Sequence, residues 1–341
     1  MKAIVVTEPP RFELQNVREP ECGPRQVIIR TAFCGICGTD LEILRGTMPH
    51  GFARYPVVPG HEWTGVVDEA GREVSNLRAG DRVSVEGYLP CGDCDPCRRG
   101  DKQSCVTHGQ IGMTQNGGFA EYVAAPAGSC HIIAEHVGLD EALMVEPAST
   151  VVRGIEHASP RPSSTAAVIG CGPIGLIAAR VLSGFEPAAI LGIDLASSQG
   201  VMATQAGFTG FTTSQNPSEL REQSGSDGWD VVVDCALGAK PLDLALRIVR
   251  PGGKIVVIGG APDSHTLHIP ANLFVTRDLQ VYGVLGYTTQ SWIRTLDLVS
   301  NGSLVLGDLI SHRRRIEDFN SVVSLLESRT EPLGKVSICF S

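Results

Sequence analysis

A glycine-rich hexapeptide in the middle of the chain constrains the fold more than any other feature. Gly170-Cys171-Gly172-Pro173-Ile174-Gly175 follows a short apolar run at 166–169 and opens a segment, 174–183, with apolar residues at helical spacing. In a G-x-G-x-x-G turn, the first glycine permits the turn, the second admits a pyrophosphate and the third lets helix pack on strand. The pattern predicts a dinucleotide site on a βαβ unit, formed by Gly170, Gly172, Pro173, Ile174 and Gly175.

An aspartate follows this turn at the distance that such sites require. Asp194 stands nineteen residues after Gly175, at the end of the next apolar run. A carboxylate there accepts hydrogen bonds from the adenosine ribose hydroxyls and repels a 2′-phosphate. We therefore predict NAD rather than NADP as coenzyme, with a surface aspartate as the alternative interpretation of Asp194.

The surrounding segments predict an α/β domain. Helical spacing also occurs at 242–249 and 292–300, and Pro251-Gly252-Gly253 is predicted to end the first of these helices before the next strand. Short apolar runs alternate with the helical segments, which is typical of buried parallel strands. These runs lie at 166–169, 189–193, 230–233, 254–258 and 279–284.

The first 150 residues have a different character. They are rich in glycine and proline, with short alternating segments at 26–30 and 81–85 that favour a β-rich, barrel-like unit. A strand-like segment at 335–340 closes the chain. A chain of 341 residues is too long for one ordinary core, so we predict two domains.

Composition excludes several classes of function. The net charge is −9, which argues against nucleic-acid binding. The apolar runs are far shorter than the roughly 20 residues of a membrane helix. The N-terminus reaches Glu8, Pro9 and Pro10 before a signal-peptide core forms, so we expect a cytoplasmic protein with neither a nucleic-acid nor a membrane partner.

Eleven cysteines in such a chain argue for metal binding rather than disulfides, because reducing compartments keep thiols free. Four thiolates satisfy tetrahedral zinc completely, so a four-cysteine site would organise a loop rather than bind substrate. Free thiols and an iron–sulfur cluster are the alternatives. Four of the cysteines fall within fifteen residues: Cys91, Cys94, Cys97 and Cys105.

Three shorter motifs suggest a second metal site. Cys37 lies in C-G-I-C-G-T-D, His61 and Glu62 lie in G-H-E, and Glu146 precedes a proline. Taken singly, each is more often structural, because a lone cysteine usually behaves as a small buried hydrophobe. Together, one thiolate, one imidazole and one carboxylate form a zinc set that keeps a coordination position open.

The ordered set of motifs resembles the zinc-containing medium-chain dehydrogenases, particularly their polyol, butanediol and threonine dehydrogenase branch, over nearly the full chain. The resemblance implies a GroES-like catalytic domain from residues 1–150, to which 287–341 return. It also implies a Rossmann NAD-binding domain with a doubly wound parallel sheet from 151–286. Each subunit would hold two Zn²⁺ ions, the catalytic one bound by Cys37, His61 and either Glu62 or Glu146.

The resemblance further implies hydride transfer between an alcohol and NAD, with zinc lowering the pKa of the bound hydroxyl. Thr39 would pass the proton onward; its alternative role is that of a turn hydroxyl. Two residues depart from the family pattern. Many relatives carry a histidine where this chain has Glu42, and NAD-linked relatives often place an arginine over the adenine where this chain has Gln199.

Relatives of this branch oxidise polyols, sugars, cyclitols, diols or β-hydroxy amino acids to ketones. The runs at 44–46 and 55–63 resemble those of cyclitol dehydrogenases of the 2-deoxy-scyllo-inosamine type. Three other interpretations stay open: a threonine-type dehydrogenase, a zinc-free quinone or enoyl reductase, and a non-catalytic metal or redox sensor. By analogy alone, a homodimer or homotetramer is expected.

Overall fold

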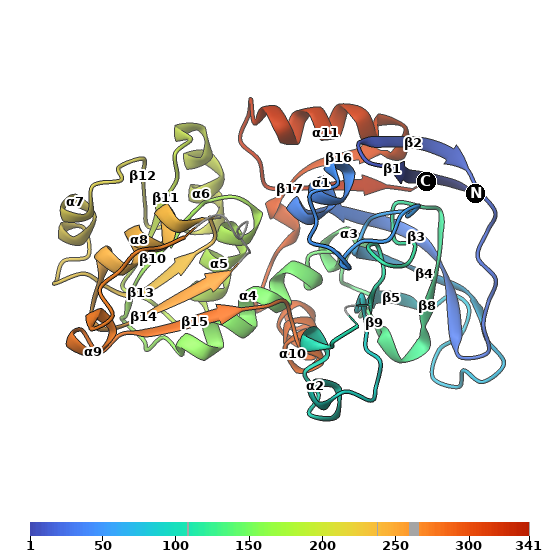
Figure 1. Ribbon diagram of the computed structural model, residues 1–341, viewed down its shortest axis with the longest axis horizontal. Coiled ribbons are helices and arrows are strands. Elements are labelled where there is room, and N and C mark those ends of the chain that lie inside the picture. Colours follow the sequence, from blue (N-terminus) through green and yellow to red (C-terminus); the bar gives the residue numbers. More distant parts are fainter. Residues whose placement is uncertain (108, 237, 259–265, 341) are drawn as a thin grey trace.

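The computed structural model describes residues 1–107, 109–236, 238–258 and 266–340, and it folds into two lobes (Figure 1). One lobe is built on a six-stranded parallel sheet and the other on a seven-stranded mixed sheet. Within the described ranges, no helix has the length and apolar character that crossing a bilayer requires.

The parallel sheet has the strand order β12-β11-β10-β13-β14-β15. The chain starts in the middle at β10 and winds outward in both directions, which is the doubly wound Rossmann order. Ligands bind such sheets at the carboxyl ends of the strands, where the winding reverses. The strands are β10 (Thr165–Ile169), β11 (Ala189–Ile193), β12 (Gly210–Thr212), β13 (Trp229–Asp234), β14 (Val249–Ile258) and β15 (Gln280–Val284).

Helices cover both faces of this sheet because alternate strand residues point to opposite sides. Val168 and Val233 pack into one buried cluster, whereas Ala167 and Val232 pack into another. The first cluster includes α4 (Val145–Ala158), α5 (Pro173–Ser183), α6 (Gly200–Ala206) and α10 (Thr289–Ser300). The second includes residues of α7 (Pro217–Glu222), α8 (Ala239–Ile248) and α9 (Leu273–Thr276).

The predicted helix stop at Pro251-Gly252-Gly253 was wrong in its placement. Helix α8 ends earlier, at Ile248, and the three residues lie inside β14. They form an irregularity there: the register with β13 shifts between Trp229 and Val231, and Gly252 has a φ of +71°. Glycine tolerates this left-handed conformation because it has no Cβ.

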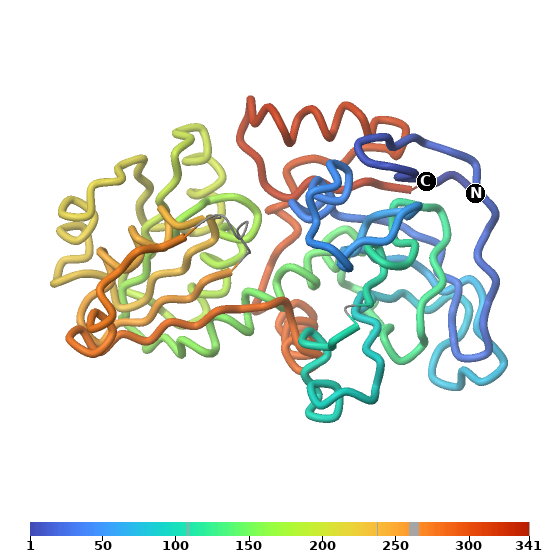
Figure 2. The backbone as a smooth tube through the Cα atoms, viewed as in Figure 1, coloured from blue at the N-terminus to red at the C-terminus, as the bar shows by residue number. Residues whose placement is uncertain are grey.

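The mixed sheet brings the two ends of the chain together. Strand β3 (Gln26–Ile36) pairs antiparallel with β17 (Lys335–Cys339), so the C-terminal strand lies beside the N-terminal ones (Figure 2). Strand β16 (Ile310–Arg315) extends the sheet at β17. The remaining strands are β4 (Glu62–Ala70), β5 (Arg82–Val85), β8 (Tyr122–Pro126) and β9 (Cys130–Ile132).

Smaller elements complete this lobe. Two antiparallel strand pairs lie outside the main sheet: β1 (Lys2–Glu8) with β2 (Arg11–Asn16), and β6 (Tyr88–Leu89) with β7 (Gly109–Gln110). The helices are α1 (Gly38–Arg45), α2 (Asp95–Arg98), α3 (Leu139–Ala142) and α11 (Phe319–Ser328).

A buried carboxylate ties three parts of the molecule together. Glu86, 1% exposed, follows β5 and accepts hydrogen bonds from His131 (2.8 Å), Thr289 (2.9 Å) and Lys102 (3.4 Å). Burial raises the pKa of Glu86, but the bond to His131, the Lys102 charge and the Thr289 bond outweigh it, so the net pKa is lowered. The folded protein therefore favours the ionised carboxylate.

Replacing Glu86 with glutamine is expected to lower the free energy of unfolding by about 2–3 kcal/mol at pH 7, because buried charge-assisted hydrogen bonds are lost. A lowered folded pKa contributes stability above the unfolded pKa of about 4.3 and loses it as pH falls through the folded pKa. The difference from wild type should therefore be constant above about pH 5 and shrink below about pH 4. Urea unfolding at several pH values measures this.

Glu73→Gln is the matched control. Glu73 is paired with Arg25 at 2.8 Å on the surface, where ion pairs contribute little. Equal losses of stability in the two variants would contradict the role assigned to Glu86.

Candidate active site and metal centres

Three of the predicted ligands converge where the mixed sheet meets α1. One ligand atom from each of Cys37, His61 and Glu62 lies within 4.8 Å of the others. Cys37 is the N-cap of α1 after β3, and Glu62 opens β4, the neighbour of β3. Strand pairing thus brings together residues that are distant in the sequence. A thiolate, an imidazole and a carboxylate are a donor set that fits zinc.

Asp40 holds two of these ligands from behind. Its side chain is fully buried and accepts hydrogen bonds from the backbone N–H of Cys37 (2.8 Å) and of Gly60 (3.2 Å). Its Oδ1 also lies 3.3 Å from Nδ1 of the buried His61, at ion-pair distance. A carboxylate behind a histidine fixes the ring orientation and leaves the other nitrogen for a metal.

Glu62 is held by a buried lysine. Lys335, at the start of β17, donates to both carboxylate oxygens of Glu62, at 2.6 and 2.8 Å. Glu62 is 1% exposed and Lys335 2% exposed. Burial lowers the pKa of Lys335, but the Glu62 carboxylate outweighs it and the net pKa is raised. The hydrogen-bonded pair lies in the interior.

Glu146 lies close to this group but is not part of the three-residue cluster. It sits in the first turn of α4 and is half-buried. Burial raises the pKa of Glu146 to about 7, against the opposing charge of His61. Tyr88 faces the same region: burial and the Glu146 charge raise its pKa. Its ring packs on Tyr287, with ring centroids 4.7 Å apart.

The proposed proton-transfer residues lie on α1. The Oγ1 atom of Thr39 is 3.8 Å from Sγ of Cys37. Glu42 is half-buried one turn further along the helix, and burial raises the pKa of its carboxyl group. A half-buried threonine hydroxyl beside the Cys37 side chain fits a role in proton transfer.

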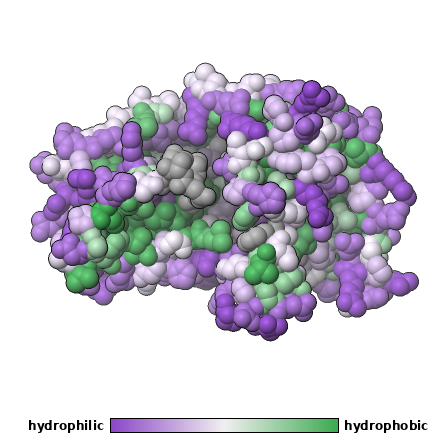
Figure 3. Space-filling model, in the orientation of Figure 1, coloured by the Kyte–Doolittle hydropathy of each residue, from purple (hydrophilic) through white to green (hydrophobic). Residues whose placement is uncertain are grey.

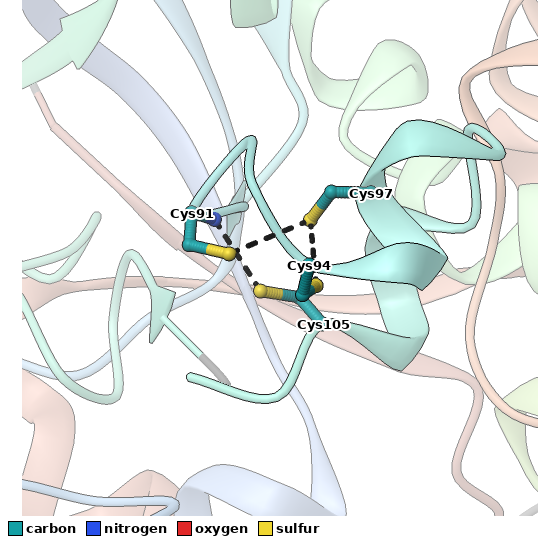
Figure 4. A group of neighbouring side chains, drawn as sticks. All are labelled: Cys91, Cys94, Cys97 and Cys105. Atoms are coloured by element: carbon teal, nitrogen blue, oxygen red, sulfur yellow. Dashed lines mark hydrogen bonds between the residues drawn. The ribbon is translucent and has the colours of Figure 1, made fainter.

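The four-cysteine loop forms a second cluster, in which the side chains point toward one centre (Figure 4). Sγ of Cys97 is 3.4 Å from that of Cys94 and 3.9 Å from that of Cys91. Tetrahedral zinc with Zn–S bonds of about 2.3 Å requires sulfur separations of about 3.8 Å, so the spacing fits. Burial opposes ionisation of Cys105, but hydrogen bonds from Thr107 and from the backbone of Cys91 lower its pKa to about 6.

The glycine loop joins β10 to α5. Gly170 has a φ of +89°, and a Cβ at Gly175 would lie 1.9 Å from the carbonyl oxygen of Gly170. A Cβ at Gly172, the N-cap of α5, would meet no atom within 4 Å. The loop therefore leaves open space at the start of a helix, where unpaired N–H groups bind phosphates.

Asp194 and Gln199 flank this loop in different ways. The Asp194 carboxylate accepts hydrogen bonds from the backbone N–H of Cys171 (2.7 Å) and of Ala196 (2.9 Å). The side chain of Gln199 is buried. It is 8% exposed and bonds to the carbonyl of Cys171 and to the backbone of Leu333.

Sequence analysis assigned no role to two residues of this region, Asp40 and Lys335. Asp40 stands three residues after Cys37, so its helical position was a signal that it caps the same turn. Lys335 is a lone cation at the start of the apolar segment 335–340, and a charge in a buried strand usually has a partner. The partner, Glu62, is distant in the sequence.

Comparison with known proteins places the chain in a family. Residues 23–135 match the alcohol dehydrogenase GroES-like domain, and residues 173–301 match the zinc-binding dehydrogenase domain. Sorbitol dehydrogenase of Arabidopsis thaliana is 31% identical, over 89% of this chain and 85% of that protein.

Two solved structures share the whole fold. RspB of Escherichia coli CFT073, complexed with NADH, has a TM-score of 0.92 at 27% identity, covering 100% of this chain and 99% of that one. A zinc-binding dehydrogenase of Sinorhizobium meliloti, bound to NADP, has a TM-score of 0.90 at 27% identity, covering 99% of each chain. The predicted Rossmann and GroES-like fold class is confirmed, and the chain belongs to the zinc-binding medium-chain alcohol and polyol dehydrogenase family.

Proposed function

We propose that this chain transfers hydride between a secondary alcohol of a polyol or cyclitol and NAD, at a site where Cys37, His61 and Glu62 bind a catalytic zinc ion. The convergence of these three donors within 4.8 Å carries the proposal. A second zinc ion, on Cys91, Cys94, Cys97 and Cys105, has a structural role. Each chain then holds two Zn²⁺ ions.

When bound, zinc supplies a Lewis acid that lowers the pKa of the substrate hydroxyl, and NAD⁺ supplies the hydride acceptor. Asp40 orients the imidazole of His61, and Thr39 carries the substrate proton away from the site. Lys335 holds Glu62 by two hydrogen bonds of 2.6 and 2.8 Å. Glu146, whose pKa is raised to about 7, is the alternative carboxylate ligand when Glu62 stays with Lys335.

We propose NAD as the coenzyme. The residues that would bind it are Gly170, Gly172, Pro173, Ile174, Gly175 and Asp194. The Asp194 carboxylate lies against the glycine loop, where it repels a 2′-phosphate. Residues 194–201 contain no lysine or arginine to bind such a phosphate. Leu195, 81% exposed, adds apolar surface beside the ribose site.

The function is tested by a substrate screen on purified, zinc-loaded protein. Polyols, cyclitols, vicinal diols, threonine and simple alcohols are compared in assays with NAD⁺ and with NADP⁺. We expect turnover of polyols or cyclitols, faster with NAD⁺, and its loss after removal of the catalytic zinc by a chelator. Turnover of threonine alone would indicate the threonine-type dehydrogenase, and cyclitol turnover well above the rest would indicate the scyllo-inosamine type.

Two outcomes would contradict the proposal. Reduction of quinones or enoyl compounds by a zinc-free preparation would indicate the reductase class. Coenzyme and zinc binding without turnover of any alcohol would favour the sensor. The donor set favours neither, since a reductase of that class has no use for Cys37 and His61, and a sensor needs no Thr39.

We also propose a cytoplasmic homodimer. The described cysteines are free thiols, and a reducing compartment keeps thiols free. Apolar side chains gather over β15, the edge strand of the parallel sheet, and over α9 (Figure 3). Val281 is 39% exposed, Leu285 60% and Val275 83%. Pairing of two β15 edges would cover them, and the mass of the protein in solution measures the state.

A further inference from the structure

Gln199 makes hydrogen bonds that connect the glycine loop with the C-terminal segment. Its Nε2 donates to the carbonyl oxygen of Cys171 at 2.7 Å and to that of Leu333 at 3.0 Å. Its Oε1 accepts from the backbone N–H of Leu333 at 2.7 Å. Both donors of the amide are used and its oxygen is bonded, in a side chain that is 8% exposed.

The residue held on the loop side is Cys171, which lies between the first two glycines of the motif. Its backbone is bonded at both ends: the N–H to Asp194 at 2.7 Å and the carbonyl to Gln199. A pyrophosphate bound in the loop would approach the same stretch of backbone. A change in the Cys171 peptide therefore changes the bond to Gln199.

On the other side, Gln199 holds Leu333, which stands two positions before Lys335, the partner of Glu62. Leu333 precedes Gly334, whose Cα is closely packed: a Cβ there would lie 2.1 Å from the carbonyl oxygen of Leu309 and 2.9 Å from Met202. Lys335 comes next and binds Glu62. Two residues of extended chain span at most about 7 Å, so little slack separates Leu333 from Lys335.

We propose that Gln199 is a positioning residue that couples occupancy of the glycine loop to the Lys335–Glu62 ion pair beside the catalytic zinc. The inference rests on the proposed function for the identity of coenzyme and metal. The route runs from Cys171 through Gln199 and Leu333 to Lys335 and then to Glu62. The test measures the coupling factor between the nucleotide site and the catalytic zinc.

The probe is ADP-ribose, which fills the nucleotide site without the nicotinamide ring and so makes no direct contact with the zinc ligands. Calorimetry gives its Kd for the zinc-loaded protein and for protein depleted of catalytic zinc. The ratio of the two constants is the coupling factor, and no turnover is needed to measure it. Allosteric coupling factors are typically about 5 to 150, so we expect at least about fivefold in wild type.

Gln199→Met keeps the shape of the side chain and removes its amide. We expect its coupling factor to fall to about one, while melting curves show that the protein is folded. Gln205→Met is the matched control, because Gln205 also reaches the C-terminal segment, donating to the carbonyl of Asp308 at 2.6 Å, without contacting the glycine loop. It should keep the wild-type factor.

If Gln199→Met fails to fold, Gln199→Glu serves instead: it keeps the acceptor for the N–H of Leu333 and loses the donor to the carbonyls of Cys171 and Leu333. Its factor should therefore also fall to about one. The inference would be overturned if the Gln199 variant kept the wild-type coupling factor, or if Gln205→Met lost it to the same extent. If the wild-type enzyme binds NADH and turns over alcohol but has a coupling factor of one, the inference is overturned while the proposed function stands. Absence of NADH binding would overturn the proposed function and the inference with it.

Discussion

Replacing Cys37 with serine is expected to lower alcohol-dependent reduction of NAD⁺ by about a thousandfold or more. A Lewis acid at the reacting oxygen contributes several kcal/mol to transition-state stabilisation, and each 1.36 kcal/mol corresponds to a tenfold rate. A serine hydroxyl does not ionise near neutral pH, so the donor set keeps only His61 and Glu62. Zinc content should fall from two to one per chain, as metal analysis measures.

The fold should survive this change, because Cys37 is only half-buried and lies at the end of a strand. Cys22→Ser is the control: Cys22 is half-buried too and lies outside both metal clusters. It should keep two zinc ions and full activity. Two zinc ions in Cys37→Ser, with activity unchanged, would refute the assignment of the catalytic site.

Replacing Cys105 with serine is expected to remove the other zinc ion and to destabilise the loop from Cys91 to Cys105. The loop has little secondary structure, since α2 has four residues and no buried side chain, and such a helix is not stable by itself. Zinc binding therefore supplies its folding free energy. At free zinc a thousandfold above its Kd, the loss corresponds to about 4 kcal/mol.

Three measurements check this second prediction. Metal analysis should give one zinc ion per chain, thermal melting should show a lower midpoint, and limited proteolysis should cut between residues 91 and 105. Arg98→Ala is the control within the same loop, because Arg98 forms an exposed ion pair with Asp95 at 2.8 Å. It should change none of the three. A protease-resistant loop in Cys105→Ser would show that the cysteines are not needed to order it.

Local patterns were enough to predict most of the parallel sheet. The runs at 166–169 and 189–193 became β10 and β11, and the helical spacing after Gly172 became α5. Strands β12 and β16 were not predicted. β12 has only three residues, and β16 carries His312 and three arginines because it lies at an edge. Neither shows the buried, apolar pattern on which the prediction depends.

The candidate site also has parts that the sequence predicted and parts that it did not. Motifs with short spacing, the four cysteines and the glycine loop, pointed to their chemistry directly, because their donor atoms lie within a few residues of one another. The choice between Glu62 and Glu146 was beyond the sequence. Glu62 is next to His61 in the sequence, but it lies within 4.8 Å of Cys37 because β3 and β4 pair in this register.

By itself, the sequence determined the chemistry available to this protein: the ligand types, the glycine turn, and the strand and helix periods that depend on near neighbours along the chain. Only the tertiary structure decided which distant groups meet. Lys335 reaches Glu62 because the C-terminal strand pairs with β3, and Gln199 reaches Leu333 across the two lobes. Such contacts follow from how the sheets and lobes pack, and no local pattern encodes their pairing.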